Sequence, residues 1–236
     1  MESARIFTST LAMYHNLSTS MGDIPSFLLE GNKDVVLLIF PSVFGVDSDI
    51  EDIARHFFAK GYSVLAVDPF WNVEPGPLGH SIADVEQALY RMRQLPFDEA
   101  CHQAHAFSVA ARNVASRVVA LGVGYGGKLA FSTLSRGGVE AVSIWHCSGL
   151  GRMLDLIPTI KGPLELHYGG LDATTPAIER EVLQSFFTEH DSFSIQLYPE
   201  GKHNFSLASG SNFQPSLYQI LMSSLDRLLI NQLEML

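Results

Sequence analysis

Basic side chains are scarce in this sequence. Its 236 residues include 15 lysines and arginines against 25 aspartates and glutamates, which gives a formal net charge of −10 at pH 7. No segment of five or more basic residues interrupts this acidic balance. Because nucleic acids and anionic membrane surfaces attract basic patches, the composition disfavours both as partners. A small-molecule substrate or ligand is the expected partner.

Cysteines and long apolar runs are scarce as well. Cys101 and Cys147 are the two cysteines and lie far apart in the sequence, which fits a reducing compartment better than a disulfide framework. No stretch approaches the roughly 18 apolar residues of a membrane-spanning helix. Residues 1–5 lack the charged segment and apolar run of a signal peptide. We therefore expect a cytoplasmic protein, as a monomer or homodimer.

Apolar runs that alternate with helix-like segments fill most of the chain. Two β-rich segments come first, at 6–14 and 24–30, and the polar stretch 15–22 between them indicates a hairpin or short meander. Buried strands are expected at 35–40, 62–67, 117–121, 139–145, 164–168 and 194–198, and helices at 49–60, 81–94, 97–113, 128–135, 176–187 and 215–233. This alternation predicts an α/β fold over residues 1–236, one domain with a mostly parallel, doubly wound sheet and an N-terminal antiparallel strand or hairpin.

The predicted strand 117–121 runs into the glycine-rich segment 122–127 and then a helix. This is the outline of a nucleophile elbow, in which a strained turn presents a Ser or Cys for attack. Gly124 stands where the nucleophile is expected, so that position is vacant. The backbone amides of Tyr125 and of Val43, in the loop after the strand 35–40, would form an oxyanion hole.

Gly122, Gly124 and Gly127 also match the glycine pattern of a dinucleotide-binding site. That pattern is expected at the first βα turn of a domain, and this turn comes later in the chain, so we expect no cofactor.

Asp172 and His203 follow two consecutive predicted strands, 164–168 and 194–198. In a parallel sheet both would lie at the rim where the strands end, which is where ligands bind. An Asp that holds a His in one tautomer is the orienting pair of a catalytic triad. The alternatives are a helix-capping aspartate and a surface histidine.

Other rim residues are candidates for a substrate pocket. His146 and Cys147 end the predicted strand 139–145 and could line the pocket, and Cys147 could instead be a displaced nucleophile or a small core residue. The full set of expected pocket residues is Ser42, Phe44, Trp71, His146, Cys147, Phe205 and Leu207. We expect no metal, because His102 and His105 have no third ligand nearby in the sequence.

Several blocks resemble the dienelactone hydrolase family, small cytoplasmic α/β-hydrolases that open cyclic enol-lactones with a Cys-His-Asp triad. The blocks are Phe44-Gly45-Val46, Gly61-Tyr62, Asp68-Pro69, the glycine elbow, Tyr168-Gly169-Gly170-Leu171-Asp172 and Tyr198-Pro199-Glu200-Gly201-Lys202-His203-Asn204-Phe205. The resemblance covers almost the whole chain. It implies an α/β-hydrolase fold and carries over Asp172 and His203 as triad members.

Three chemically linked positions depart from the family pattern. The family elbow reads Gly-x-Cys-x-Gly-Gly, and Gly124 replaces the cysteine. A glutamate that interacts with the thiol is common in the loop after the third strand, where this chain has Ser42. An arginine that holds a substrate carboxylate is replaced by Leu207. Together these changes indicate a site for a less anionic substrate and a mechanism without a thiolate.

Three functions fit this degenerate triad. In the first, Asp172 and His203 form a general base that acts with the oxyanion hole on a small apolar or weakly polar ester, lactone or related carbonyl compound. The outcome could be hydrolysis, or an isomerase, cyclase or lyase reaction. In the second, the protein is an inactive small-molecule binder. In the third, Ser42 or Cys147 serves as an off-position nucleophile, which fits the expected geometry least well.

Overall fold

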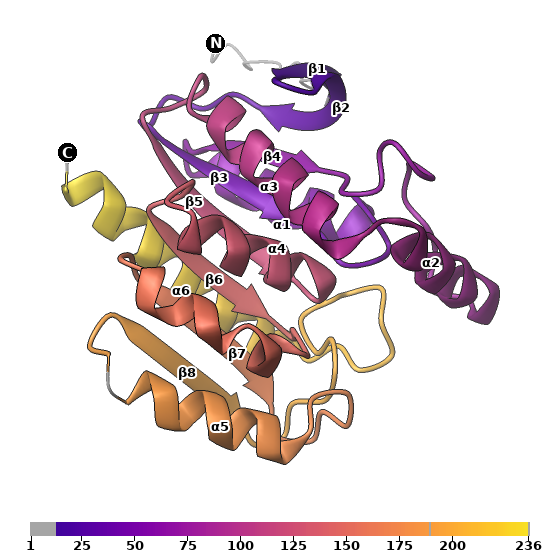
Figure 1. Cartoon of the computed structure of the whole chain (residues 1–236), viewed down its shortest axis with the longest axis vertical. Helices are drawn as coiled ribbons and strands as arrows, with labels where there is room; N and C mark the ends of the chain where they lie inside the picture. The colour runs from indigo at the N-terminus through magenta and orange to yellow at the C-terminus, as the bar shows by residue number, and fades with distance from the viewer. Residues whose placement is uncertain (1–12, 189, 236) are drawn as a thin grey trace, which may run out of the picture.

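A twisted sheet forms the centre of the molecule (Figure 1). The structure, a computed structural model, describes residues 13–188 and 190–235. Within them the sheet has eight strands in the order β1-β2-β4-β3-β5-β6-β7-β8. The strands are β1 (Met13–Thr19), β2 (Gly22–Leu29), β3 (Val35–Phe40), β4 (Ser63–Val67), β5 (Arg117–Val123), β6 (Ala141–Trp145), β7 (Leu164–Gly169) and β8 (Phe193–Tyr198).

The strand directions confirm the predicted fold class. Strands β4, β3, β5, β6, β7 and β8 are parallel to one another, whereas β1 pairs antiparallel with β2 and β2 antiparallel with β4. The expected strand 6–14 falls mostly outside the described residues. The polar stretch 15–22, expected as a separator, is largely β1 itself. Its polar side chains are tolerated because β1 is an edge strand, in which Leu17 is buried between exposed neighbours.

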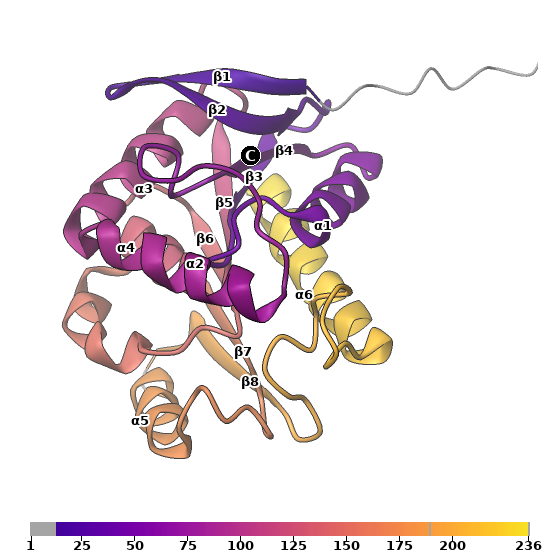
Figure 2. The same cartoon turned by 90° about the vertical axis from the view of Figure 1, so that its right-hand side faces the viewer.

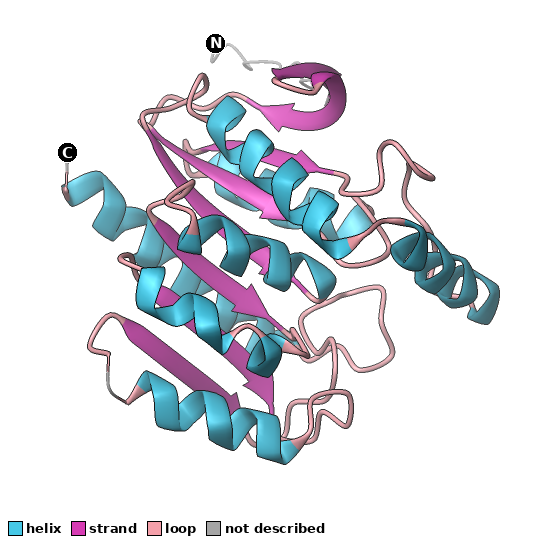
Figure 3. Ribbon diagram, viewed as in Figure 1, coloured by secondary structure: helices cyan, strands magenta, loops and turns pink. Residues whose placement is uncertain are grey.

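Helices cover both faces of the sheet (Figures 2 and 3). Helices α1 (Ser48–Ala59) and α6 (Pro215–Glu234) pack on one face, and α3 (Phe97–Ala111), α4 (Tyr125–Ser135) and α5 (Ala177–Phe187) on the other. Helix α2 (Ile82–Gln94) stands beyond the end of the central strands (Figure 1). Two short 3-10 helices, Leu150–Arg152 and Leu154–Thr159, occupy a segment for which the sequence predicted no element. No helix in the described part of the chain is long and apolar enough to cross a membrane.

Strand β3 shows how one apolar run serves two cores. All six of its residues, Val35–Phe40, are buried. Since successive side chains of a strand point to opposite faces, Val36, Leu38 and Phe40 join the core beneath α3 and α4. Val35, Leu37 and Ile39 join the core beneath α1 and α6. A strand buried on both faces therefore reads as an unbroken apolar run.

The parallel register brings the ends of the strands to one edge. Phe40 at the end of β3 pairs with Gly122 of β5, and Val123 of β5 pairs with Trp145 at the end of β6. At the far side, Gly169 of β7 pairs with Tyr198 of β8. The loops that follow these strands are thereby gathered along the same edge of the sheet.

Candidate active site

The turn between β5 and α4 has the backbone of a nucleophile elbow. Gly124 joins the two elements with φ of 53° and ψ of −118°, a conformation that residues with a side chain rarely adopt. Its N–H donates to the carbonyl of Trp145 at 2.9 Å, and its own carbonyl accepts from the N–H of Gly127 at 3.0 Å. The turn is thus fixed from both sides, with Gly124 at its apex.

The positions of this turn differ in whether packing requires glycine. A Cβ at Gly122 would lie 2.5 Å from the Cα of Gly127, and one at Gly126 would collide with the carbonyl oxygen of Phe40. These glycines let α4 pack closely on the sheet. A Cβ at Gly124 would meet only Ser42, whose Cβ would be 3.3 Å away. Packing therefore leaves room for a small side chain at the apex, and this chain has none there.

Asp172 and His203 lie within hydrogen-bonding distance of each other. The Nδ1 atom of His203 is 2.9 Å from Oδ2 of Asp172, and the hydroxyl of Thr174 bridges the pair, 2.6 Å from Oδ1 of Asp172 and 2.7 Å from Nδ1 of His203. The Asp172 side chain is fully buried, while that of His203 is 32% exposed. Burial alone would raise the pKa of Asp172, but the hydrogen bonds from His203 and Thr174 outweigh it and lower this pKa to about 2. Asp172 is therefore ionised at neutral pH.

A second histidine, His146, lies beside His203. Its ring centroid is 6.3 Å from that of His203 and 4.4 Å from that of Phe205, in both cases edge to face. Its Nε2 atom is 2.8 Å from the hydroxyl of Ser206, and its backbone has φ of 56°. Burial, with a smaller contribution from nearby His203, lowers the pKa of His146 to about 3. His146 is therefore neutral at neutral pH and adds no charge beside His203.

A cavity of about 280 Å³ joins the elbow to His203. Gly124, Tyr125, Val43 and Ser42 form one part of its wall, and His203 and His146 another. The hydroxyl of Ser42 accepts from the N–H of Phe44 at 3.3 Å, within the loop that follows β3. The complete wall is Ser42, Val43, Phe44, Leu89, Met92, Gly124, Tyr125, Lys128, His146, Ser148, His203 and Asn204.

Five of these wall residues were not predicted. Leu89 and Met92 come from α2, which the sequence identifies as a helix without indicating that one of its faces reaches the rim. Lys128 lies in the first turns of α4 and adds a cation to the wall. Ser148 and Asn204 directly follow the predicted site residues Cys147 and His203, and this adjacency could have identified them. The bridging role of Thr174 was also missed, although an Asp followed two residues later by Thr is typical of a tight side-chain turn.

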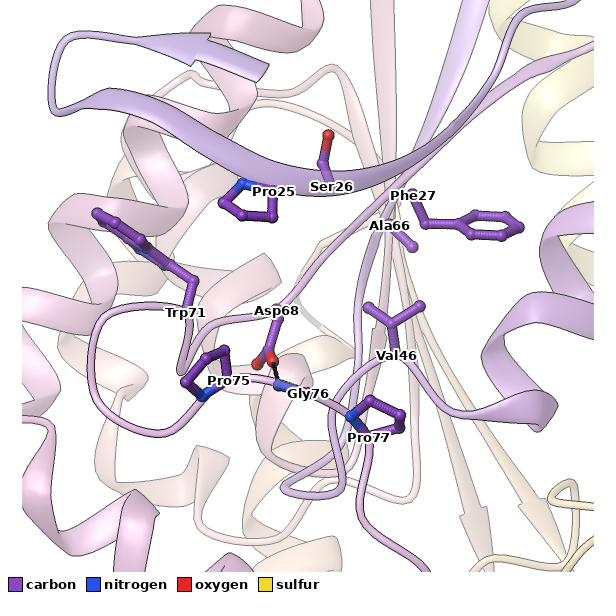
Figure 4. A pocket seen from close by; sticks show the side chains of 10 residues that line it. All are labelled: Pro25, Ser26, Phe27, Val46, Ala66, Asp68, Trp71, Pro75, Gly76 and Pro77. Carbon is purple, nitrogen blue, oxygen red and sulfur yellow. Dashed lines mark hydrogen bonds between the residues drawn. The ribbon is translucent and has the colours of Figure 1, made fainter. Parts of the chain in front are cut away.

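Four residues expected in the pocket lie elsewhere. Cys147 is buried against Gly127, on the α4 side of the sheet, and burial raises the pKa of its thiol to about 12. Phe205 and Leu207 are buried in the core beneath α1 and α6. Trp71 lines a separate cavity of about 200 Å³, between β2 and the loop after β4 (Figure 4). Neither the position of Cys147 nor the state of its thiol suits a displaced nucleophile.

One group of side chains in the described residues has metal-like spacing. It consists of Asp47, Asp49 and His80. Asp47 caps α1 by accepting from the N–H of Ile50 at 3.1 Å, and Asp49 accepts from the N–H of Ser209 at 3.1 Å. Both carboxylates thus have structural partners. His102 and His105 are not part of this group.

Comparison with known proteins identifies the family. A sequence profile of the Dienelactone hydrolase family matches residues 26–218. The chain belongs to the dienelactone hydrolase family. Carboxymethylenebutenolidase from Pseudomonas putida is 25% identical to it over 202 residues, which are 77% of this chain and 79% of that protein.

Solved structures share the α/β-hydrolase fold of this dienelactone hydrolase family member. A dienelactone hydrolase-like promiscuous phosphotriesterase from metagenomic libraries superposes with a TM-score of 0.73 at 16% identity, over 92% of this chain and 96% of the other. Dienelactone hydrolase from Anabaena variabilis gives a TM-score of 0.69 at 16% identity, over 93% and 96% of the two chains. The fold is therefore retained at low sequence identity.

Proposed function

We propose that this dienelactone hydrolase family member is an enzyme that cleaves a small apolar or weakly polar ester or lactone without a covalent nucleophile. His203, oriented by Asp172, acts as the general base. The backbone amides of Tyr125 and Val43 form the oxyanion hole. The observation that carries the proposal is the 2.9 Å contact between Nδ1 of His203 and Oδ2 of Asp172, in a site whose elbow has Gly124 at its apex.

The hydrogen bonds around Asp172 assign the proton on His203. An ionised carboxylate only accepts, so Nδ1 of His203 carries the proton that it donates to Asp172. The hydroxyl of Thr174 donates to the other oxygen of Asp172 at 2.6 Å. The lone pair of His203 then resides on Nε2, which is free to act as a base. The Asp172 charge stabilises the imidazolium that forms when Nε2 takes up a proton.

Hydrolysis then proceeds through water at the vacant apex. Nε2 of His203 takes a proton from a water molecule while the water oxygen bonds to the carbonyl carbon of the substrate. The carbonyl oxygen becomes an oxyanion that the two amides stabilise by roughly 3–4 kcal/mol. The bond to the leaving oxygen breaks, and His203 returns the proton to that oxygen. Gly124 supports this route because it leaves free, for the attacking water, the space that a nucleophilic side chain would occupy.

The expected rate is low. Triad enzymes that lose their nucleophile retain a rate of only about 10³–10⁴ over the uncatalysed reaction, from the oxyanion hole and binding. The same base could instead remove a proton from a C–H or O–H group of a carbonyl substrate, which would make the reaction an isomerisation, cyclisation or elimination. Such reactions need no nucleophile at Gly124.

A non-catalytic binding protein is the second candidate. The observation that favours it is Gly124 itself, since a binder has no use for a nucleophile. The ionised, hydrogen-bonded Asp172 beside His203 argues against it, because ligand binding alone does not require an oriented imidazole. In either case we propose a cytoplasmic location, which the two free thiols Cys101 and Cys147 support.

Substitution of His203 tests the proposal. With p-nitrophenyl acetate as the probe ester, we expect His203→Ala to lower kcat/KM by roughly 100-fold or more. His102→Ala, which removes an exposed histidine on α3, is the matched control and should leave kcat/KM unchanged. Equal rates for the wild type and His203→Ala would favour the binding protein. Loss of turnover in Ser42→Ala would instead assign the reaction to a serine nucleophile.

A further inference from the structure

Arg91 is the one charged residue that α2 buries. Along this helix the buried residues are Ala88 and Arg91, and the Arg91 side chain is fully shielded from solvent. Burying a guanidinium group is costly unless its N–H groups are bonded. Arg91 meets this condition with backbone carbonyls, which it reaches in two different loops.

The first of these loops carries Val43, one of the two proposed oxyanion donors. Nε and Nη2 of Arg91 donate to the carbonyl of Val43 at 3.1 and 2.7 Å. Within the loop, the N–H of Gly45 donates to the carbonyl of Ser42 at 3.1 Å and the N–H of Phe44 donates to the Ser42 hydroxyl. These bonds fix the peptide groups on both sides of Val43. The peptide group that carries the Val43 N–H is thereby held in place, and Val43 lines the cavity.

The second loop anchors the guanidinium from the other side. Nη1 of Arg91 donates to the carbonyls of Glu74 and Gly76 at 2.9 and 2.8 Å. The carboxylate of Asp68 fixes the same loop by accepting from the N–H of Gly76 at 2.7 Å (Figure 4) and from the N–H of Phe70 at 2.9 Å. Arg91 therefore lies between two segments whose backbones are themselves bonded.

Contacts through Phe70 connect this anchor to the second oxyanion donor. The guanidinium carbon of Arg91 lies 4.7 Å from the centroid of the Phe70 ring. The Phe70 ring in turn stacks on the ring of Tyr125 at 5.6 Å between centroids. Both proposed oxyanion donors, Val43 and Tyr125, are thus within one or two contacts of the same guanidinium group.

We propose that Arg91 is a positioning residue of the active site, which holds the loop after β3 so that the Val43 amide points at the developing oxyanion. This inference rests on the proposed function for its effect on catalysis. The holding of the loop itself is independent of any reaction. Arg91 does not touch the substrate, because its N–H groups are directed at the carbonyls of Val43, Glu74 and Gly76.

The test combines hydrogen exchange with kinetics in Arg91→Lys and Arg91→Ala. Amide exchange of Phe44 and Gly45, measured by NMR, should accelerate roughly tenfold or more in Arg91→Ala, because the loop loses charge-assisted hydrogen bonds. The kcat for p-nitrophenyl acetate should fall roughly 100-fold with little change in KM, as for loss of one oxyanion donor. Arg91→Lys should lie between the wild type and Arg91→Ala. If Arg91→Ala does not fold, Arg91→Lys carries both measurements.

Two controls separate positioning from general stability. Arg112 also donates to backbone carbonyls, those of Ser116 and Gly138, but these lie at the opposite end of the sheet from the site. Arg112→Ala should change neither loop exchange nor kcat. Millimolar guanidinium ion, but not methylammonium, should restore part of the kcat of Arg91→Ala.

The outcomes distinguish this inference from the proposed function. Unchanged exchange at Phe44 and Gly45 in folded Arg91→Ala would overturn it, whatever the activity. Faster exchange with an unaltered kcat would also overturn it, because the loop would then not position a catalytic donor. If the wild type has no His203-dependent turnover, the proposed function fails, while the exchange measurement still decides whether Arg91 holds the loop.

Discussion

On one side of the cavity, Asp172, Thr174 and His203 bond one another at 2.6 to 2.9 Å. On the other side, Gly124 has no side chain, and the hydroxyl of Ser42 accepts from the N–H of Phe44. The first side is held by a buried, ionised carboxylate that is costly to maintain without a purpose. The second leaves open a position that packing would allow to be filled. Under the proposed function, this difference means that the site keeps its groups for proton transfer and lacks a group for covalent catalysis.

Filling the open side should produce the largest effect. We expect Gly124→Cys to raise the rate of p-nitrophenyl acetate cleavage roughly 100-fold or more, because His203 can then activate a thiol next to the oxyanion donors. The left-handed backbone should cost about 1–3 kcal/mol of stability, measured by denaturant unfolding. Gly137→Cys is the matched control, since Gly137 has φ of 70° and open space around it, away from the site. A Gly124→Cys variant that folds and gains no activity would show that the remaining side is not competent.

Removing the second histidine should change the pH dependence of stability. The pKa of His146 is about 3 in the folded protein, against 6.5 for an unperturbed histidine. As the pH falls below about 6.5, His146 takes up a proton in the unfolded chain but not in the folded chain. The free energy of unfolding therefore decreases below that pH. His146 accounts for about 2 kcal/mol of loss between pH 7.5 and 5. His146→Asn, which suits the positive φ, should reduce this loss in urea titrations at the two pH values. The same pH dependence in the variant would contradict a neutral, buried His146.

Lys128 should give the smallest effect. It lies on the cavity wall and makes no salt bridge with the described residues. For probe esters that bear a carboxylate, Lys128→Met should raise KM up to about fivefold, which corresponds to a partly solvated ion pair. The KM for neutral esters should not change, and Lys161→Met, at an exposed lysine elsewhere, should affect neither class. An equal change for both classes would show that Lys128 acts through packing and not through its charge.

The fold could be predicted because strands buried on both faces leave a distinct pattern. The run Val35–Phe40 and the run Val64–Val67 within β4 appear in the sequence as uninterrupted apolar segments bounded by polar residues or proline. The polar stretch 15–22 was not predicted as a strand because β1 has one exposed face, whose polar side chains interrupt the apolar run. The short helices Leu150–Arg152 and Leu154–Thr159 are too short to show a helical spacing of apolar residues in the sequence.

The candidate site could be predicted only in part, for reasons of side-chain direction. Asp172 and His203 were expected at one rim because both follow parallel strands, and the structure places them 2.9 Å apart. Their catalytic role remains a prediction. Trp71 was assigned to the wrong cavity because a loop's position in the sequence does not tell on which side its side chains point. The proposed role of Arg91 depends on carbonyls 48 and 17 residues away in the sequence, and no local motif reveals such contacts.

The intact mass of the protein during turnover tests the central claim most directly. The wild type and Gly124→Cys would be quenched in acid during reaction with p-nitrophenyl acetate and weighed by mass spectrometry. Direct attack by water under general base catalysis predicts that the wild type releases product with no acyl adduct at any time. Gly124→Cys should carry one acetyl group on Cys in the same experiment. An acetyl adduct on Ser42 or any other side chain of the wild type, formed and lost at the rate of turnover, would contradict the account.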